Sequence, residues 1–268
     1  MHRMIISPAI PLKNETSKYN EPTAKPRAKF SDEPAVSSSD IYAVIPAAGI
    51  GSRMNSDTPK QYLNINGTSI LTHTIERMLQ LVSLKKMVVV LDQLTFKQDR
   101  TMFDENPRVE TCVGGATRAE SVRNGLQYLA GSAAPGSRVM VHDAARPCVR
   151  VAEINRLISE TENTPDGGLL AMPVVDTIKR ADVRMRITET VDRSQLWRAA
   201  TPQLFPLTVL LDALTNALDA GVEITDEASA MQSAGYSPKL VECSADNIKV
   251  TTPTDLVLAE QYLTAQTV

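Results

Sequence analysis

The 268-residue chain predicts an α/β fold. In this fold a mainly parallel, Rossmann-like twisted sheet carries helices on both faces, and a β-hairpin arm protrudes. The first observation is that short apolar runs alternate with longer amphipathic runs, which is typical of strands buried between helices. The second is a charged segment at about 176–196, with short alternating patches such as Met185-Arg186-Ile187. This segment interrupts the alternation, and we expect it to form the arm.

The regular pattern begins at Ile41, after a segment of different composition. Residues 1–40 hold five of the 16 prolines, many Ser, Lys and Glu, and no sustained periodicity. We predict a flexible N-terminal extension there, followed by one domain at 41–268 that includes the arm. Mixed charges and the lack of a long apolar stretch argue against a secretory signal. A plastid-type transit peptide remains an alternative.

The remaining elements follow from periodicity. Strands are expected at residues 41–45, 86–91, 139–142, 169–175 and 239–243. Helices are expected at 69–82, 118–130, 151–161 and 206–220, with a last helix from about Thr254, which can cap it. In such sheets, ligands bind beyond the C-terminal ends of the strands.

Composition excludes several classes of function. Net charge is -3 and aromatic content is 4%, so neither a basic footprint for nucleic acid or membrane nor a set of base-stacking rings is expected. The longest strongly apolar run, Met87–Leu91, is too short to span a bilayer. Cys112, Cys148 and Cys243 form no CxxC pair, which favours buried thiols in a reducing compartment. We therefore predict a cytoplasmic protein.

A loop of small residues, Pro46–Arg53, follows the first predicted strand. Small side chains let backbone N–H groups approach a triphosphate, and the helix start that follows favours an anion. Arg53 and Lys60 add cationic donors. The dinucleotide spacing GxGxxG would need glycine at Met54, and the P-loop pattern GxxxxGK[ST] is absent. We expect phosphate binding; the alternative is a tight turn that uses glycine for backbone reasons alone.

Two later segments supply further candidate site residues. In Gly114–Val122 the glycines allow a flat base to approach and Ser121 can hydrogen-bond to it, although a plain helix N-terminus is an equal alternative. Asp143 ends a predicted strand, where a carboxylate suits Mg²⁺. Asp143 could instead cap a helix or pair with Arg146. His142 is expected to be structural.

The stretch AAGIGSRMNSDTPKQYL at 47–63 resembles the opening loop of nucleotidyltransferases. Its PKQY continuation resembles the 2-C-methyl-D-erythritol 4-phosphate cytidylyltransferase family, which uses CTP in non-mevalonate isoprenoid synthesis. Matching segments follow in the family's order: GGATRAESV (114–122), HDAARP (142–147), DTIKR (176–180), TVDR (190–193), ATPQ (200–203) and ADNIKVT (245–251). The resemblance extends over about 41–263.

The resemblance implies in-line attack by the phosphate of 2-C-methyl-D-erythritol 4-phosphate on the α-phosphorus of CTP, with pyrophosphate leaving. It implies catalytic roles for Arg53, Lys60, Asp143 and Lys249, with Asp143 also binding Mg²⁺ or another divalent cation. The implied CTP-binding residues are Pro46, Ala47, Ala48, Gly49, Gly51, Arg53, Lys60, Gly115, Ser121, Ala144 and Lys249. The implied acceptor-binding residues are Asp143, Arg146, Thr177, Arg193 and Thr201. Because the family's arm exchanges between two subunits, a homodimer is expected.

Two other functions stay open at this point. A ribitol 5-phosphate or related alcohol-phosphate cytidylyltransferase would share the loop and fold, although the arm and the Thr201-Pro202-Gln203 segment favour methylerythritol phosphate. A non-catalytic nucleotide-binding protein would be expected to have lost part of the charged set, all of which is present. Thr225-Asp226-Glu227 also matches the family, and we interpret it as a helix cap, with Asp226 and Glu227 in the first turn.

Overall fold

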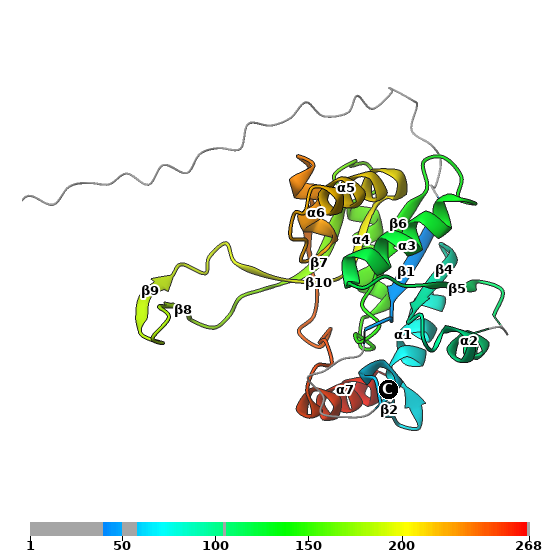
Figure 1. The fold of residues 1–268 in the computed structure, drawn as a ribbon. Helices are drawn as coiled ribbons and strands as arrows, with labels where there is room; N and C mark the ends of the chain where they lie inside the picture. The colour runs from blue at the N-terminus through cyan, green and yellow to red at the C-terminus, as the bar shows by residue number, and fades with distance from the viewer. Residues whose placement is uncertain (1–39, 50–57, 104–105, 267–268) are drawn as a thin grey trace, which may run out of the picture.

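A seven-stranded sheet forms the centre of this computed structural model, which describes residues 40–49, 58–103 and 106–266 (Figure 1). The strand order is β11-β7-β10-β6-β1-β4-β5. The strands are β1 (Ile41–Pro46), β4 (Leu84–Leu91), β5 (Val109–Val113), β6 (Arg138–Val141), β7 (Gly168–Pro173), β10 (Trp197–Pro206) and β11 (Lys239–Glu242). The α/β fold is confirmed. Each strand and helix expected by residue range is present, with ends shifted by a few residues at most.

The sheet is parallel except at β10, which runs antiparallel to both β6 and β7. Sequence periodicity did not predict this strand. It carries Arg198, Pro202 and Gln203 among its apolar residues, and its register shifts between Ala199 and Gln203. Polar residues and an irregular register obscure the apolar pattern on which a strand prediction depends.

Alternate residues of the central strands enter two separate cores. Ile41, Ala43 and Ile45 of β1 face one core, and Tyr42 and Val44 face the other. The first core is closed by α1 (Ile70–Leu79) and α4 (Val151–Glu160), and the second by α3 (Arg118–Ala130), α5 (Leu207–Asp219) and α6 (Glu227–Ser233). Burial on both faces explains why these strands read as continuous apolar runs.

Smaller elements surround this sheet. They are η2 (Lys60–Tyr62), β2 (Asn64–Ile65), β3 (Thr68–Ser69), α2 (Phe96–Asp99), η3 (Arg100–Phe103) and α7 (Pro253–Gln266). The last helix begins one residue before the expected start, so Pro253 occupies its first turn and Thr252, not Thr254, accepts the N–H of Asp255. Proline suits that first position because its missing N–H needs no partner. No helix in the described ranges is long and apolar enough to cross a membrane.

The charged segment forms the expected hairpin. Strands β8 (Ile178–Ala181) and β9 (Ile187–Val191) pair antiparallel and project from the ends of β7 and β10, away from the sheet (Figure 1). Arg180 and Glu189 form an ion pair across it at 2.9 Å. The arm therefore has its own cross-strand contacts, and most of its residues are exposed. Residues 1–39 of the predicted extension lie outside the described ranges.

Candidate active site

A pocket of about 310 Å³ lies where β1, β5 and β6 end. These strands are parallel, so their C-terminal ends meet at one edge, as expected for a ligand site in such a sheet. The residues that line it are Pro46, Ala47, Ala48, Gly49, Lys60, Gln61, Gly115, Ala116, Thr117, Arg118, Ser121, Asp143, Ala144, Ala145 and Lys249. Segments far apart in the sequence thus form a single site.

The other candidate residues lie elsewhere. Gly51 and Arg53 are outside the described residues. Arg146 and Thr201 are buried beside the pocket without lining it. Thr177 and Arg193 belong to the exposed arm, and neither lines the pocket.

Asp143 is surrounded by three cationic side chains. Its Oδ1 accepts a hydrogen bond from Nε of Arg118 at 3.1 Å, and its Oδ2 lies 3.3 Å from Nε of Arg146 and 3.0 Å from Nζ of Lys249. Burial alone would raise the pKa of Asp143, but the charges of Arg118, Lys249 and Arg146 hold it well below its usual range. Asp143 is therefore an ionised carboxylate at neutral pH.

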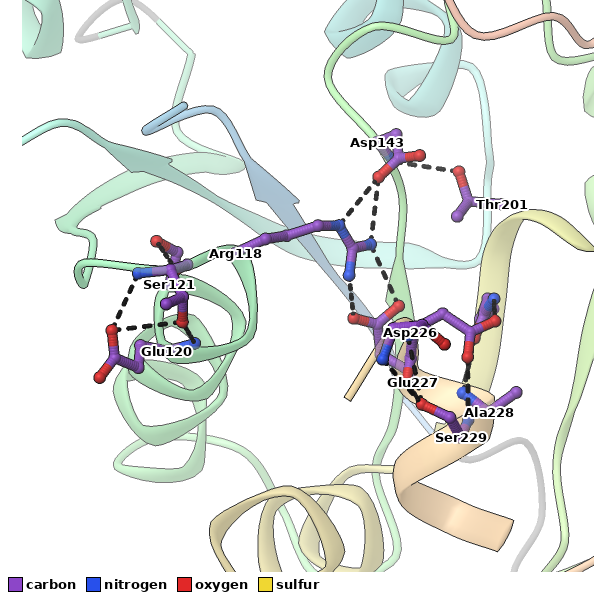
Figure 2. A network of polar contacts seen from close by, with 12 residues as sticks. Arg118, Glu120, Ser121, Asp143, Thr201, Asp226, Glu227, Ala228 and Ser229 are labelled. Atoms are coloured by element: carbon purple, nitrogen blue, oxygen red, sulfur yellow. Dashed lines mark hydrogen bonds and ion pairs between the residues drawn. The ribbon is translucent and has the colours of Figure 1, made fainter. Parts of the chain in front are cut away.

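Arg118 links Asp143 to a second carboxylate (Figure 2). Its Nη1 and Nη2 donate to Oε1 and Oε2 of Glu227 at 2.7 and 3.2 Å. Burial lowers the pKa of Arg118, but Glu227 and Asp143 outweigh this and raise it above its ordinary value. Arg118 was not among the predicted site residues, although it lies inside the GGATRAESV segment. Glu227 was predicted only to lie in the first turn of a capped helix; Asp226 is the cap, and α6 begins at Glu227.

His142, which precedes Asp143, is fully buried, and both of its ring nitrogens have hydrogen-bond partners. Its Nε2 lies 3.1 Å from the carbonyl oxygen of Arg146, which can only accept, so Nε2 carries the proton. Its Nδ1 lies 3.0 Å from the hydroxyl of Thr201, which already accepts the N–H of Asp143 and must donate to Nδ1. Burial lowers the pKa of His142 to about 4. The ring is neutral at physiological pH and fixes the backbone on both sides of Asp143.

The loop after β1 is fixed by Gln61 of η2. The buried Gln61 amide donates to the carbonyl oxygens of Ala47 and Gly49 at 2.8 and 3.0 Å. The N–H of Ala47 bonds to Val90 of β4. These bonds fix the backbone at Ala47 and Gly49, both of which line the pocket. The PKQY segment therefore supplies both Lys60 at the pocket and the amide that shapes the loop.

Gly114 and Gly115 allow the start of α3 to pack closely. A Cβ at Gly114 would lie 2.7 Å from Cβ of Ala48, and one at Gly115 would lie 2.4 Å from Cβ of Glu120. The hydroxyl of Ser121 accepts the N–H of Gly115 at 3.1 Å and donates to the carbonyl oxygen of Thr117. The helix-terminus alternative is thus present, with Thr117 and Glu120 forming a capping box. Gly115 and Ser121 nevertheless line the pocket.

The position of Lys249 depends on Asn247. The Asn247 amide donates to the carbonyl oxygen of Thr201 at 3.0 Å, while Nη1 of Arg146 donates to the carbonyl oxygen of Asn247 at 2.8 Å. Nζ of Lys60 donates to the carbonyl oxygen of Val250 at 3.3 Å. These bonds join the ADNIKVT segment to β10, to the residues after β6 and to η2, and so bring both lysines to one pocket.

Comparisons with known proteins identify the family of this chain. The family described as 2-C-methyl-D-erythritol 4-phosphate cytidylyltransferase matches residues 41–265. A curated protein of that name from Yersinia pseudotuberculosis is 50% identical over 231 residues, covering 86% of this chain and 94% of the relative. The structure of the Francisella tularensis enzyme is 36% identical in sequence, with a TM-score of 0.71, and the match covers 84% of this chain and 100% of that one. The Thermus thermophilus structure is 29% identical with a TM-score of 0.67, over 83% of this chain and 98% of that one. This chain belongs to the 2-C-methyl-D-erythritol 4-phosphate cytidylyltransferase family.

Proposed function

We propose that the chain transfers the cytidylyl group of CTP to 2-C-methyl-D-erythritol 4-phosphate, giving 4-diphosphocytidyl-2-C-methyl-D-erythritol and pyrophosphate. The observation that carries this proposal is the convergence of Lys60, Lys249 and an ionised Asp143 on one pocket beside the loop after β1. Two ammonium groups near backbone N–H groups suit a triphosphate. The family membership supplies the identity of the nucleotide and the acceptor.

The reaction needs positioning and charge neutralisation rather than a strong base. An oxygen of the acceptor phosphate, already ionised, forms a bond to the α-phosphorus as the bond to the bridging oxygen of pyrophosphate breaks. Lys60 and Lys249, together with Arg53, are proposed to stabilise the charge that develops on the α-phosphate and leaving group. Asp143 then holds the Lys249 ammonium within 3.0 Å until the phosphates compete for it.

The base and the acceptor are proposed to occupy different parts of the site. Gly115 and Ser121 at the start of α3 are placed for the cytosine, and Ala144 and the small residues after β1 for the ribose and phosphates. Thr177 and Arg193, on the arm, are proposed to bind the acceptor phosphate. The buried Thr201 and Arg146 act on the acceptor through Asp143, because each is bonded to that residue.

We propose a divalent cation, Mg²⁺ or a similar ion, that arrives with the nucleotide. Asp143 is the one carboxylate among the described residues that line the pocket, and the described ranges contain no group of three acidic, His or Cys side chains suited to a metal. Mg²⁺ is commonly held by one or two carboxylates, substrate phosphates and water, so the donor set fits an ion bound mainly by phosphate. Asp143 would hold it after Lys249 turns to the phosphates. The ion would neutralise triphosphate charge.

The arm is proposed to join two copies of the chain in a homodimer. Its exposed side chains include Val183, Met185 and Ile187, with exposures between 67% and 101%. Large apolar side chains gathered on a projecting hairpin indicate a protein contact. We also propose a cytoplasmic location, which the three free cysteines support.

The direct test is turnover by the purified chain. CTP, Mg²⁺ and 2-C-methyl-D-erythritol 4-phosphate are mixed with the enzyme, and pyrophosphate and the diphosphocytidyl product are quantified. Ribitol 5-phosphate in a parallel reaction decides the acceptor, and we expect a much lower kcat/KM for it. CTP binding without product would support a non-catalytic nucleotide-binding protein and overturn the proposal.

A further inference from the structure

The carboxylate of Glu227 is buried at the first residue of α6 and is hydrogen-bonded to Arg118, which lines the pocket (Figure 2). It is 1% exposed and does not line the pocket. A buried carboxylate is costly unless it is paired, and Arg118 satisfies both of its oxygens with two parallel N–H groups. That planar, two-point contact fixes the plane of the guanidinium as well as its distance.

The same guanidinium turns its Nε toward Asp143, at 3.1 Å from Oδ1. The charges therefore alternate along Glu227, Arg118, Asp143 and Lys249. With Oδ1 occupied by Arg118, the other oxygen of Asp143 is the one presented to Lys249. Glu227 thus holds Arg118, Arg118 holds Oδ1 of Asp143, and Oδ2 of Asp143 contacts Lys249, the lysine proposed to act on the phosphates.

Several hydrogen bonds fix the start of α6, where Glu227 lies. Asp226 caps the helix and forms a capping box with Ser229. Gln203 of β10 donates to Oδ2 of Asp226 at 2.9 Å and accepts the N–H of Ala228 at 2.8 Å. Strand β10 pairs with β6, which ends next to Asp143. The start of α6 is therefore bonded to β10, and Asp143 follows the neighbouring strand β6. Arg118 spans the distance between Glu227 and Asp143.

We propose that Glu227 is a positioning residue for cytidylyl transfer, which sets the orientation of Asp143 and Lys249 by holding Arg118. This inference rests on the proposed function of the same pocket. Stabilisation of α6 alone would need only a cation beside Glu227, whereas that cation, Arg118, also contacts Asp143 and so connects Glu227 to the groups proposed to react. Its loss should therefore slow the chemical step more than it weakens CTP binding.

The test compares Glu227→Gln with Ser229→Ala, which loosens the same helix start without touching Arg118. We expect Glu227→Gln to lower kcat about tenfold or more and to change the KM for CTP by less than about threefold. Ser229→Ala should keep kcat within about twofold of wild type even if the melting temperature falls. If Glu227→Gln does not yield folded protein, Glu227→Asp, which keeps the charge but shortens the reach, replaces it.

A double-mutant cycle separates positioning from general stability. Arg118→Met removes the bridge, so adding Glu227→Gln to it should lower kcat no further than about twofold. Additive losses, a wild-type kcat in Glu227→Gln, or an equal fall in Ser229→Ala would overturn the inference. Wild-type turnover is measured first: a wild type without activity contradicts the proposed function, while an active wild type with an equally active Glu227→Gln contradicts only the role of Glu227.

Discussion

The hydroxyl of Thr201 accepts the backbone N–H of Asp143 at 3.0 Å, so the antiparallel strand β10 holds the main chain of the residue that carries the pocket carboxylate. Thr201→Val keeps the shape and removes the hydroxyl, which leaves that N–H and Nδ1 of His142 without a partner. Each unpaired buried group costs about 1–3 kcal/mol, so the free energy of unfolding should fall by about 2–6 kcal/mol in urea titrations. Thr201→Ser keeps the hydroxyl and should stay close to wild type. A stable Thr201→Val would contradict this account.

The buried, neutral His142 predicts acid-sensitive stability. Its pKa is lowered by burial to about 4 in the folded chain, against about 6.5 when unfolded. Between these values the unfolded state binds more protons, so the free energy of unfolding should fall by about 3 kcal/mol as pH drops from about 6.5 to 4. That stability is fully present above the unfolded pKa.

Urea titrations at about pH 7.5, 6 and 5 measure this slope. His142→Gln should flatten it, because no imidazole is then left at this buried position to take up a proton. An unchanged slope in His142→Gln would assign the acid sensitivity to another group.

Removal of the Lys60 ammonium should impair the chemical step. Its Nζ contacts the segment of Lys249 and lines the pocket, so Lys60→Ala is expected to lower kcat/KM by about 10²–10³, or about 3 kcal/mol. The same loss is expected for Arg53→Ala. Pyrophosphate release measures both. Lys85→Ala, which removes an exposed lysine paired with Asp40, serves as the control. Near-wild-type turnover in Lys60→Ala would remove that residue from the mechanism.

Gln61 should affect CTP binding rather than chemistry. Gln61→Ala releases the carbonyl oxygens of Ala47 and Gly49, and the loop loses its fixed shape. We expect the KM for CTP to rise about tenfold with kcat reduced less, because preorganisation of the loop contributes to binding. Steady-state kinetics with varied CTP measure both constants. Gln98→Ala, at an exposed glutamine away from the pocket, should match wild type.

Complementation between two inactive variants tests whether the arm acts in the partner's site. Lys60→Ala and Arg193→Ala are mixed, unfolded together and refolded. If Arg193 serves the partner's pocket, half of the dimers are mixed and each carries one intact site, which restores about a quarter of wild-type activity. If Arg193 serves its own pocket, every site carries one substitution and the mixture stays inactive. A monomer in sedimentation experiments would contradict the proposed homodimer itself.

The strands and helices of the sheet were predictable because their signals are local. In β1, Ile41 to Ile45 alternate between two apolar cores, and burial on both faces leaves a continuous hydrophobic run in the sequence. The charged arm was predictable for the converse reason, since exposed strands retain polar side chains. By contrast, β10 combines Arg198, Pro202 and Gln203 with apolar residues, and only its pairing with β6 and β7 makes it a strand.

The sequence by itself determined the family and most of the pocket, because short segments such as HDAARP and ADNIKVT carry chemical groups in a fixed order. Tertiary structure decided which of these groups line the pocket and which are buried next to the lining residues. It joined Arg118 to both Asp143 and Glu227, and it placed Thr201 behind the carboxylate rather than at the pocket wall. Contacts between segments that are distant in the chain depend on how parallel strands bring their ends to one edge. A linear pattern does not record that geometry.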